Sequence, residues 1–402
     1  MDVGRWPLQT DEAALVSLIS EAIRARGSIT FADFMEHALY HPEHGYYSSG
    51  RAALGRAGDY FTSVSVGPLF GRLLAGQFAE MWEALGRRED FVIVEQGAQG
   101  GEFAHDVLSA ARREHHDLFA RLRYRIVEPF SVLQERQATA LAEFSNKIEW
   151  SRSLNETPAF HGVHFSNELI DALPVHLVRW DGAEWNERHV AESDGEFHFV
   201  HRAVSDATLL ERLCTIPQPL PAGYETEVNL AALDWIEMVA GRLTTGFVLV
   251  ADYGWPRAEF YAPHRTTGTL RCYAKHRVLP SPFVEIGNAD ITAHVEWTSL
   301  EEHAQKCGLT LAGFTDQHHF LTGLLAGNQG EDFLASADAK IKRALQTLIH
   351  PQHLGMKFQF LCLTKGGEPA NLAGFRFAQN MRSPAKSARS PSPETPPGWP
   401  RR

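Results

Sequence analysis

Cysteine is scarce in this sequence, with four residues among 402, and paired cysteines that could bind zinc are missing. The four lie far apart and include no CxxC pair: Cys214, Cys272, Cys307 and Cys362. Histidine is plentiful, with 20 residues, but the adjacent pairs at 115–116 and 318–319 point apart on any regular element, and no HExxH spacing occurs. The sequence therefore predicts a reducing compartment, no disulfide framework and no metal site.

Long apolar runs are also missing. No stretch is long enough to span a bilayer, and the start, MDVGRWPLQTDEAAL, has acidic residues where a signal peptide would have an apolar core. Basic residues are fewer than acidic ones: the sequence has 38 Lys and Arg residues and 49 Asp and Glu residues, which gives a net charge of -11. This balance argues against a phosphate-backbone partner and suits a cationic substrate. We therefore expect a cytoplasmic protein with no membrane span and no nucleic-acid partner, and we leave a homodimer open.

The sequence does contain a strand, a glycine cluster and a helix in succession, at residues 91–111. The apolar run FVIV ends on Glu95, and Gly97, Gly100 and Gly101 follow before apolar residues recur at helical spacing. Glycines let a ligand come close to the backbone, and the free N–H groups of the helix start face the same place. This is the opening of a βαβ nucleotide-binding unit, so the sequence predicts an α/β fold.

The spacing of this glycine cluster narrows the choice of ligand. A dinucleotide site needs GxGxxG, and the second required glycine is missing, so nicotinamide and flavin are not expected. An acid followed by GxGxG is typical of S-adenosylmethionine sites. Here that pattern would fall on Glu95, Gly97, Gln99 and Gly101, and three of the four positions fit. A glycine-rich turn with no ligand is the alternative for this stretch alone.

Two further segments carry side chains suited to a cofactor. The predicted strand YRIVE ends on Glu128, where a carboxylate could accept both hydroxyl groups of a ribose, and a surface acid before a proline is the alternative. GDYFTSVS holds Asp59, Thr62 and Ser63, which could touch the ligand or, instead, cap the helix predicted at 67–85.

A polar cluster follows the fourth predicted strand, in GVHFSNELIDALPV. Asn167, Glu168 and Asp171 stand at the carboxyl end of that strand, which is the edge where open α/β sheets bind their ligands. We therefore take them as the candidate acceptor site. The alternative is a helix cap formed by Asn167 and Glu168 beside a solvated Asp171.

Composition and periodicity divide the chain into three parts. Residues 1–88 are predicted as a helical region with a cofactor lid. Residues 89–379 are predicted as the main α/β domain, with a β-hairpin insertion at about 175–225. Residues 380–402 are rich in Pro, Ser and Arg and are predicted to be disordered.

Later segments complete the predicted sheet. The first helix of the main domain should run from the glycine cluster to about Leu122. GTLRCYAKH and NADITAHVEW are expected as loops, and the second carries Asp290 and His294. LTLAGF and MKFQFLCLT are expected as two late strands, which suits a reversed strand at the edge of a methyltransferase sheet and does not suit a second nucleotide-binding half.

A family resemblance runs through these segments in order, from about Ile29 to Thr364. The family's GDF-x-TSPE appears as GDYFTSVS, ELGPGRGTL as EQGAQGGEF, NEFFDALPV as SNELIDALPV and ADLTAHVDF as ADITAHVEW. The sequence thus resembles the MidA family, class I S-adenosylmethionine-dependent methyltransferases whose mitochondrial members methylate an arginine of a respiratory complex I subunit. The resemblance implies a Rossmann-like class I methyltransferase sheet with a helical N-terminal region and the β-hairpin insertion.

The resemblance also implies a cofactor, an acceptor and residues for each. The cofactor would be S-adenosyl-L-methionine, and the acceptor an arginine side chain of a protein. The cofactor would be held by Asp59, Thr62, Glu95, Gly97, Gly101 and Glu128. The acceptor side would be lined by Asp252 and Asp290 and by the catalytic candidates Asn167, Glu168, Asp171 and His294. Glu168 and Asp171 would orient the guanidinium and accept its proton during direct methyl transfer.

Three departures from the family pattern keep other functions open. Gln99 replaces a glycine, which binding would tolerate if the backbone there is αR or β. Ala98 replaces a proline, and Ser65 stands where the family has glutamate, which puts the acceptor in doubt. A methyltransferase for a small molecule is one alternative. A binding or assembly factor without catalysis is another, which the altered loop favours and the retained acids, among them Glu128, oppose.

Overall fold

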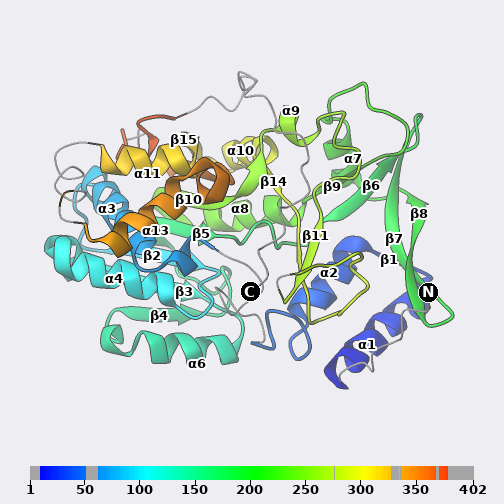
Figure 1. The fold of residues 1–402 in the computed structure, drawn as a ribbon, viewed down its shortest axis with the longest axis horizontal. Coiled ribbons are helices and arrows are strands. Elements are labelled where there is room, and N and C mark those ends of the chain that lie inside the picture. Colours follow the sequence, from blue (N-terminus) through cyan, green and yellow to red (C-terminus); the bar gives the residue numbers. More distant parts are fainter. Residues whose placement is uncertain are drawn as a thin grey trace.

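A layered α/β core and a smaller antiparallel sheet beside it make up the structure (Figure 1). The computed structural model describes residues 10–50, 62–275, 277–326, 335, 337–367 and 371–378. The central sheet follows the order β15-β16-β10-β5-β2-β3-β4, with β14 beside β10. Its strands are β2 (Phe91–Gln96), β3 (Arg123–Val127), β4 (Ile148–Ser151), β5 (Phe160–Asn167), β10 (Leu243–Trp255), β14 (Val295–Glu296), β15 (Thr310–Asp316) and β16 (Phe358–Lys365).

Strand direction in the central sheet changes only near one edge. β16 runs antiparallel to both β10 and β15, whereas the pairs among β4, β3, β2, β5 and β10 are parallel. The predicted α/β, Rossmann-like fold class is therefore confirmed, together with the late reversed strand. Because the central strands are parallel, their carboxyl ends meet at one edge, and the polar segments that follow β2, β5 and β10 lie together there.

The side chains of β2 alternate between two buried faces. Phe91 and Ile93 belong to the core on one face, and Val92 and Val94 to the core on the other. The first core is formed with α3 (Leu69–Ala84), α4 (Glu102–Glu114), α5 (His116–Arg121), α11 (Gln317–Leu325) and α13 (Ala339–Ile349). The second is formed with α8 (Ala231–Arg242) and α10 (Trp297–Lys306). β2, which leads into the glycine cluster, is thus covered by helices on both faces.

The helix after the glycine cluster is not continuous to Leu122, and that prediction is wrong. α4 ends at Glu114 and α5 begins at His116, with a non-helical φ of -132° and ψ of 59° at His115 between them. Residues 112–117 are all polar, so no apolar side chain in this stretch keeps a continuous helix against the sheet. α6 (Ser131–Ala140) and the short helix η3 (Ala142–Phe144) follow β3.

The smaller sheet combines the predicted insertion with the N-terminal helical region. β1 (Ile29–Thr30), which lies between α1 (Thr10–Arg26) and α2 (Phe31–Tyr40), pairs with β7 (Trp185–Ser193). The order continues β7-β6-β9, and β8 pairs with β7. These strands are β6 (His176–Trp180), β8 (Glu196–Ala203) and β9 (Tyr224–Val228), with α7 (Ala207–Leu213) after β8. The three-part division of the chain stays a prediction, and its tail at 380–402 lies outside the described residues.

A buried carboxylate in this sheet should make the stability of the protein depend on pH. Glu187 Oε1 lies 2.7 Å from His176 Nδ1, and Oε2 lies 3.5 Å from His189 Nε2. Burial raises the pKa of Glu187, but the hydrogen bonds and charges of the two histidines outweigh it and lower the pKa to about 2. Because the folded-state pKa is below the unfolded one, this stabilisation is present above about pH 4.5 and is lost as the pH falls toward 2.

We therefore expect the Glu187→Gln variant to unfold more easily than the wild type by about 2 to 3 kcal/mol at pH 6. The difference should shrink below about pH 4.5, because there the carboxylate takes up a proton in the unfolded wild-type chain while it stays ionised in the folded protein down to about pH 2. Urea unfolding of both proteins across this pH range measures it. A difference that stays constant from pH 6 to pH 3 would contradict the assignment.

Two segments that were predicted as loops form a third, three-stranded sheet, so that prediction is wrong. β11 (Arg271–Ala274) pairs with both β12 (Arg277–Val278) and β13 (Asp290–Thr292). The strands are too short to show an alternating pattern, and the sheet exists because distant segments pair. It places Asp290 beside the carboxyl edge of the central sheet. The remaining short helices are η2 (Val64–Val66), α9 (Arg257–Phe260), η4 (Pro351–Gly355) and η5 (Ala373–Phe375).

Among the residues that the structure describes, every helix is too short or too polar to cross a bilayer.

Candidate active site

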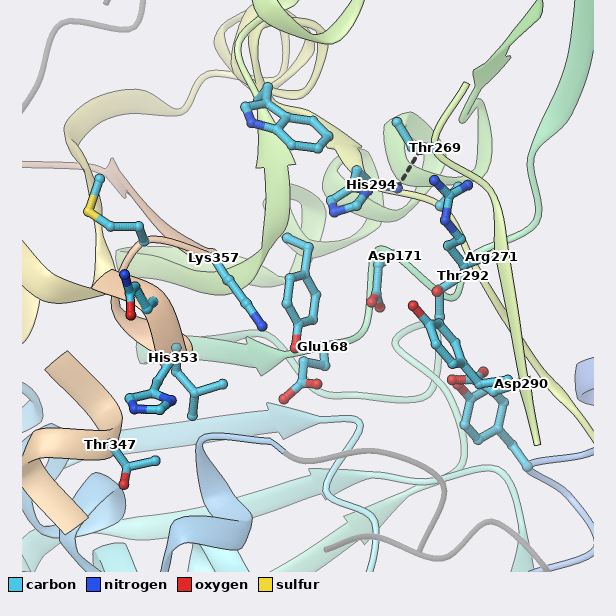
Figure 2. A pocket seen from close by; sticks show the side chains of 18 residues that line it. Glu168, Asp171, Thr269, Arg271, Asp290, Thr292, His294, Thr347, His353 and Lys357 are labelled. Atoms are coloured by element: carbon cyan, nitrogen blue, oxygen red, sulfur yellow. Dashed lines mark hydrogen bonds between the residues drawn. The ribbon is translucent and has the colours of Figure 1, made fainter. Parts of the chain in front are cut away.

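Four of the predicted site residues line a cavity of about 610 Å³ at the carboxyl edge of the central sheet (Figure 2). Glu168 and Asp171 enter it from the turn after β5, Asp290 from β13, and His294 from the segment between β13 and β14. Glu168 also lines a second, smaller cavity at the glycine loop, together with Thr62, Glu95, Gly97, Gln99 and Asn167. The two cavities therefore meet at Glu168.

The glycine loop that lines the smaller cavity has left-handed backbone at three positions. Gly97 has a φ of +81° and Gly101, which precedes α4, a φ of +89°. Gln99 has a φ of +49°, so the αR or β backbone under which binding would tolerate a side chain here is not the one observed. A glutamine thus takes the conformation that glycine adopts freely and that costs other residues about 1 to 2 kcal/mol.

Replacing Gln99 by glycine should therefore stabilise the protein. The Gln99 carbonyl accepts a 2.9 Å hydrogen bond from Gln137 Nε2, which glycine would keep. Relief of the left-handed strain is offset in part by the greater freedom of glycine in the unfolded chain, which leaves a gain of about 1 kcal/mol or less. Gln99→Ala is the matched control, because it shortens the side chain and keeps the strain. A thermal melt in which Gln99→Ala is as stable as Gln99→Gly would contradict this explanation.

Glu95 is a buried carboxyl group at the end of β2 with one described hydrogen-bond donor. Tyr124 Oη donates to its Oε2 over 2.7 Å. Burial raises the pKa of Glu95 to about 8, although the hydrogen bond from Tyr124 lowers it. A cationic ligand group in the adjoining cavity would lower this pKa again, because it would stabilise the ionised carboxylate. Glu95 is thus suited to form an ion pair with a protonated amine of a ligand.

Glu128, which follows β3, lies behind the glycine loop. Its Oε1 accepts from the Phe130 N–H over 3.1 Å, and its Oε2 accepts from Gln137 Nε2 over 3.0 Å. The same Gln137 amide group donates to the Gln99 carbonyl, so one glutamine ties Glu128 to the loop. Burial raises the pKa of Glu128 to about 7. The alternative of a solvated surface acid does not hold, because the side chain is buried.

The segment before α3 places Thr62 at the smaller cavity. Thr62 Oγ1 accepts from the Ser65 N–H, and Ser65 Oγ donates to the Thr62 carbonyl, so these two residues form a closed turn. Ser63 Oγ donates to Gln317 Oε1 over 2.8 Å and does not cap α3, which begins at Leu69 without a side-chain cap. Asp59 lies outside the described residues.

The turn after β5 carries the strongest sign of a functional site. Glu168 has a φ of +52°, a conformation that non-glycine residues adopt mainly where the surroundings impose it. Asn167 Nδ2 donates to Glu168 Oε1 over 2.9 Å, while the buried Asn167 Oδ1 has no hydrogen-bond partner among the described residues. The turn is not helical and Asp171 is buried, so the alternative of a helix cap with a solvated Asp171 is wrong.

Asp252 holds this turn in place from the end of β10. Its Oδ2 accepts from the backbone N–H groups of Leu169, Ile170 and Asp171 over 3.2, 2.8 and 3.3 Å. Burial raises the pKa of Asp252 to about 7, against the lowering effect of these hydrogen bonds. Asp252 therefore positions the turn, whereas Glu168 and Asp171 face the cavity.

Glu168, Asp171 and Asp290 place three acidic side chains on the wall of the larger cavity, and Asp252 lies close behind them. Burial, with the nearby charges of Asp252 and Asp290, raises the pKa of Glu168 well above its usual range. Asp171 is shifted in the same direction by burial and by Asp252, Glu168 and Asp290, so its pKa is also raised. The basic residues that line the cavity, Arg271 and Lys357, are exposed. The interior of the cavity thus suits a cation.

His294 and several tyrosines complete the wall. The His294 ring lies 4.4 Å from Trp255 between ring centres, and its backbone N–H donates to Thr269 Oγ1 over 2.9 Å. Burial, with Arg265 and Arg271, lowers the pKa of His294 to about 4, so its ring is neutral near pH 7. Tyr47 Oη donates to Asp290 Oδ1 over 2.6 Å.

Tyr47, Tyr253, Tyr273 and Arg271 also line the larger cavity, and sequence reasoning did not propose them. Tyr253 could have been found, because it follows Asp252 at the end of a predicted strand. Tyr47 lies in HPEHGYYSSG, a segment whose composition indicates only a loop.

Comparison with known proteins gives the family of the chain. Residues 73–315 match the family model described as "Putative S-adenosyl-L-methionine-dependent methyltransferase". A Burkholderia thailandensis protein, whose crystal structure holds S-adenosyl-homocysteine, is 31% identical with a TM-score of 0.83, over 93% of this chain and 98% of that one.

Two curated relatives carry a more specific name. Human protein arginine methyltransferase NDUFAF7, mitochondrial, is 27% identical over 94% of this chain and 89% of its own length. The Drosophila melanogaster homolog of that protein is 26% identical over 90% and 88%. Both names place the relatives in mitochondria, so the expectation of a cytoplasmic protein is wrong.

The glycine loop has features that such a cofactor needs. The left-handed Gly97 presents backbone without a Cβ, Glu95 is a buried carboxyl at the same cavity, and Asn167 offers an oxygen without a described partner. The assignment of individual residues to the cofactor stays a prediction, whereas the family match covers most of the chain and the structural match nearly all of it. The chain belongs to the S-adenosyl-L-methionine-dependent methyltransferase family, and it is an enzyme that uses this cofactor.

Proposed function

We propose that this enzyme methylates the guanidinium group of an arginine side chain in a protein. The observation that carries the proposal is the buried carboxylate wall of the larger cavity, formed by Glu168, Asp171 and Asp290 around a space of about 610 Å³. Burying several carboxylates together is costly unless a cation joins them. A guanidinium is always charged and presents five N–H donors in one plane, which matches several carboxylate oxygens.

The proposed chemistry assigns one role to each wall residue. When bound, S-adenosyl-L-methionine supplies a methyl group on a positively charged sulfur. Glu168 lines both cavities, so it is proposed to orient the attacking nitrogen and to accept the proton that the guanidinium releases. Asp171 is proposed to hold the rest of the guanidinium, and Asn167 Oδ1 to accept from it. His294, which is neutral, would accept a hydrogen bond at the cavity wall.

Positioning would supply most of the rate, because methyl transfer needs the nucleophile in line at about 3 to 3.5 Å in a water-poor site. The strained backbone at Glu168 and the three hydrogen bonds to Asp252 support this, since both fix the turn before any ligand arrives. Asp252 is therefore proposed as a positioning residue and not as a proton acceptor.

Two observations support a protein as the acceptor. The curated relatives from human and Drosophila melanogaster are named protein arginine methyltransferases. A further cavity of about 340 Å³, lined by Phe199, Val278 and Leu279 among others, shares Arg271 with the acceptor cavity. It offers apolar surface for the chain that flanks an arginine, which a small acceptor would not need.

The test is to incubate the enzyme with methyl-tritiated S-adenosyl-L-methionine and a protein extract of the expression host. After acid hydrolysis of the protein fraction, amino-acid analysis should show radioactivity that elutes with methylarginine. Label in methyl-lysine or methyl-histidine would overturn the acceptor assignment. Label confined to the small-molecule filtrate would favour a small acceptor instead.

A further inference from the structure

A second group of chemically active side chains lies away from both cavities, between α8 and α10. Glu237 projects from α8, His303 from α10, and Cys307 stands at the C-terminal cap of α10. One ligand atom from each, a carboxylate oxygen, a ring nitrogen and the sulfur, lies within 4.8 Å of the other two. His303 and Cys307 are four residues apart, so they share one face of the helical end.

The contacts within this group reach ion-pair distance between His303 and Glu237 but include no hydrogen bond to the ring nitrogen. His303 Nε2 lies 3.7 Å from Glu237 Oε2, which is too long for a hydrogen bond. The same Nε2 is buried and has no hydrogen-bond partner among the described residues. Cys307 is a free thiol on the third side, and it is partly buried. A buried ring nitrogen that faces a carboxylate and a thiol, and bonds to neither, is explained by an ion that bridges them.

The measured distance between two of the three ligand atoms fits zinc, and the third atom lies within 4.8 Å of both. Bonds of about 2.0 to 2.3 Å in a tetrahedral site place ligand atoms roughly 3.3 to 3.8 Å apart. The 3.7 Å separation of His303 and Glu237 already lies in this range. Nitrogen, sulfur and carboxylate oxygen are all zinc ligands, and a thiolate disfavours magnesium and calcium. Glu237 is exposed, so water can reach the fourth position.

We propose that Glu237, His303 and Cys307 bind a zinc ion that links α8 to α10. Binding displaces the thiol proton of Cys307 to solvent and forms one bond from each side chain to the metal. None of the three side chains lines either of the two cavities proposed for methyl transfer. Its effect is on the fold, because α8 and α10 pack on the same face of the sheet and α8 leads directly into β10. The proposal differs from the prediction made from the sequence, which was that the chain has no metal site.

Cobalt titration of the untagged, chelator-treated and reduced protein tests the site. Thiolate-bound cobalt absorbs in the near ultraviolet, and tetrahedral cobalt gives intense visible bands. The wild type should develop both with one cobalt per chain, and zinc should displace them. Cys307→Ser should lose the thiolate band, and Glu237→Gln should bind cobalt at least about tenfold more weakly.

Cys214→Ser, which removes an exposed thiol outside the group, is the matched control and should keep both bands. Zinc should also raise the melting temperature of the wild type and of Cys214→Ser, but not that of Cys307→Ser. The thermal measurement shows at the same time that each variant is folded. No thiolate band in the wild type, or a band that survives in Cys307→Ser, would overturn the proposal. These readouts do not depend on methyltransferase activity.

Discussion

Replacing Glu168 by glutamine should lower the rate of methyl transfer by about 10²- to 10⁴-fold. The variant keeps the shape of the side chain and removes its charge. It therefore loses the proposed proton acceptor, which is also the acid that lines both cavities. Binding of S-adenosyl-homocysteine should change little, because that molecule lacks the positive charge on sulfur. Single-turnover kinetics with labelled cofactor, beside calorimetric titration with S-adenosyl-homocysteine, separate the two effects.

The control for this variant is Glu211→Gln, which makes the same chemical change at an exposed position on α7. It should keep the wild-type rate. A Glu168→Gln enzyme that transfers methyl groups at the rate of this control would remove Glu168 from the mechanism. A loss of S-adenosyl-homocysteine binding together with the rate would instead assign Glu168 to the cofactor side.

The pKa of Glu168 adds a requirement to this mechanism. Burial and the neighbouring acids raise it well above its usual range, so the carboxyl group holds a proton more tightly than a solvated glutamate does. The ion pair with a guanidinium forms only with the deprotonated carboxylate. Acceptor binding should consequently tighten as the pH rises, in the wild type more than in Glu168→Gln.

Local patterns in the sequence predict the half of the structure that surrounds the glycine loop. The apolar run of β2, the left-handed glycines and the start of α4 are set by neighbouring residues, so Glu95 and Gly97 lie where the pattern indicates. The positions of the later strands along the chain follow in the same way from their apolar runs. The family resemblance extends this to the segments that carry Glu168 and Asp290.

Contacts between distant segments are what the sequence could not show. Tyr47 donates to Asp290 across 243 positions, and both come from segments predicted as loops. Asp252 was expected to line the acceptor cavity, but its Oδ2 accepts from backbone N–H groups of the turn after β5 and its Oδ1 from the N–H of Tyr253. Neither fact has a local signal, because each depends on how the three sheets pack.

The left-handed backbone at Gln99 and Glu168 could not be predicted from the sequence either. Propensity favours glycine or asparagine at such positions, and the fold imposes the conformation on glutamine and glutamate instead. The group of Glu237, His303 and Cys307 was missed for a related reason. It combines three residue types from two helices, so it contains neither paired cysteines nor the HExxH spacing that would indicate a metal site in the sequence.

Replacing Gly97 by arginine should abolish binding of S-adenosyl-homocysteine, which corresponds to a loss of affinity of more than about a hundredfold. Gly97 has a φ of +81°, and a Cβ there would lie 3.4 Å from Leu169 Cδ1, at the wall shared with Glu168. A long side chain at this position has to enter the cavity. Its charge would also oppose an amine drawn to Glu95. Calorimetric titration of the wild type and the variant measures the loss.

Gly86→Arg separates this effect from backbone strain. Gly86 has a φ of +76°, nothing lies within 4 Å of its would-be Cβ, and it is exposed after α3. Both variants therefore pay about the same conformational cost, but only Gly97→Arg blocks a cavity. Equal loss of binding in the two would mean that arginine acts through stability and that the glycine loop is not the cofactor site. Loss confined to Gly97→Arg, beside retained binding in Glu168→Gln, would divide the joined cavities into a cofactor side and an acceptor side.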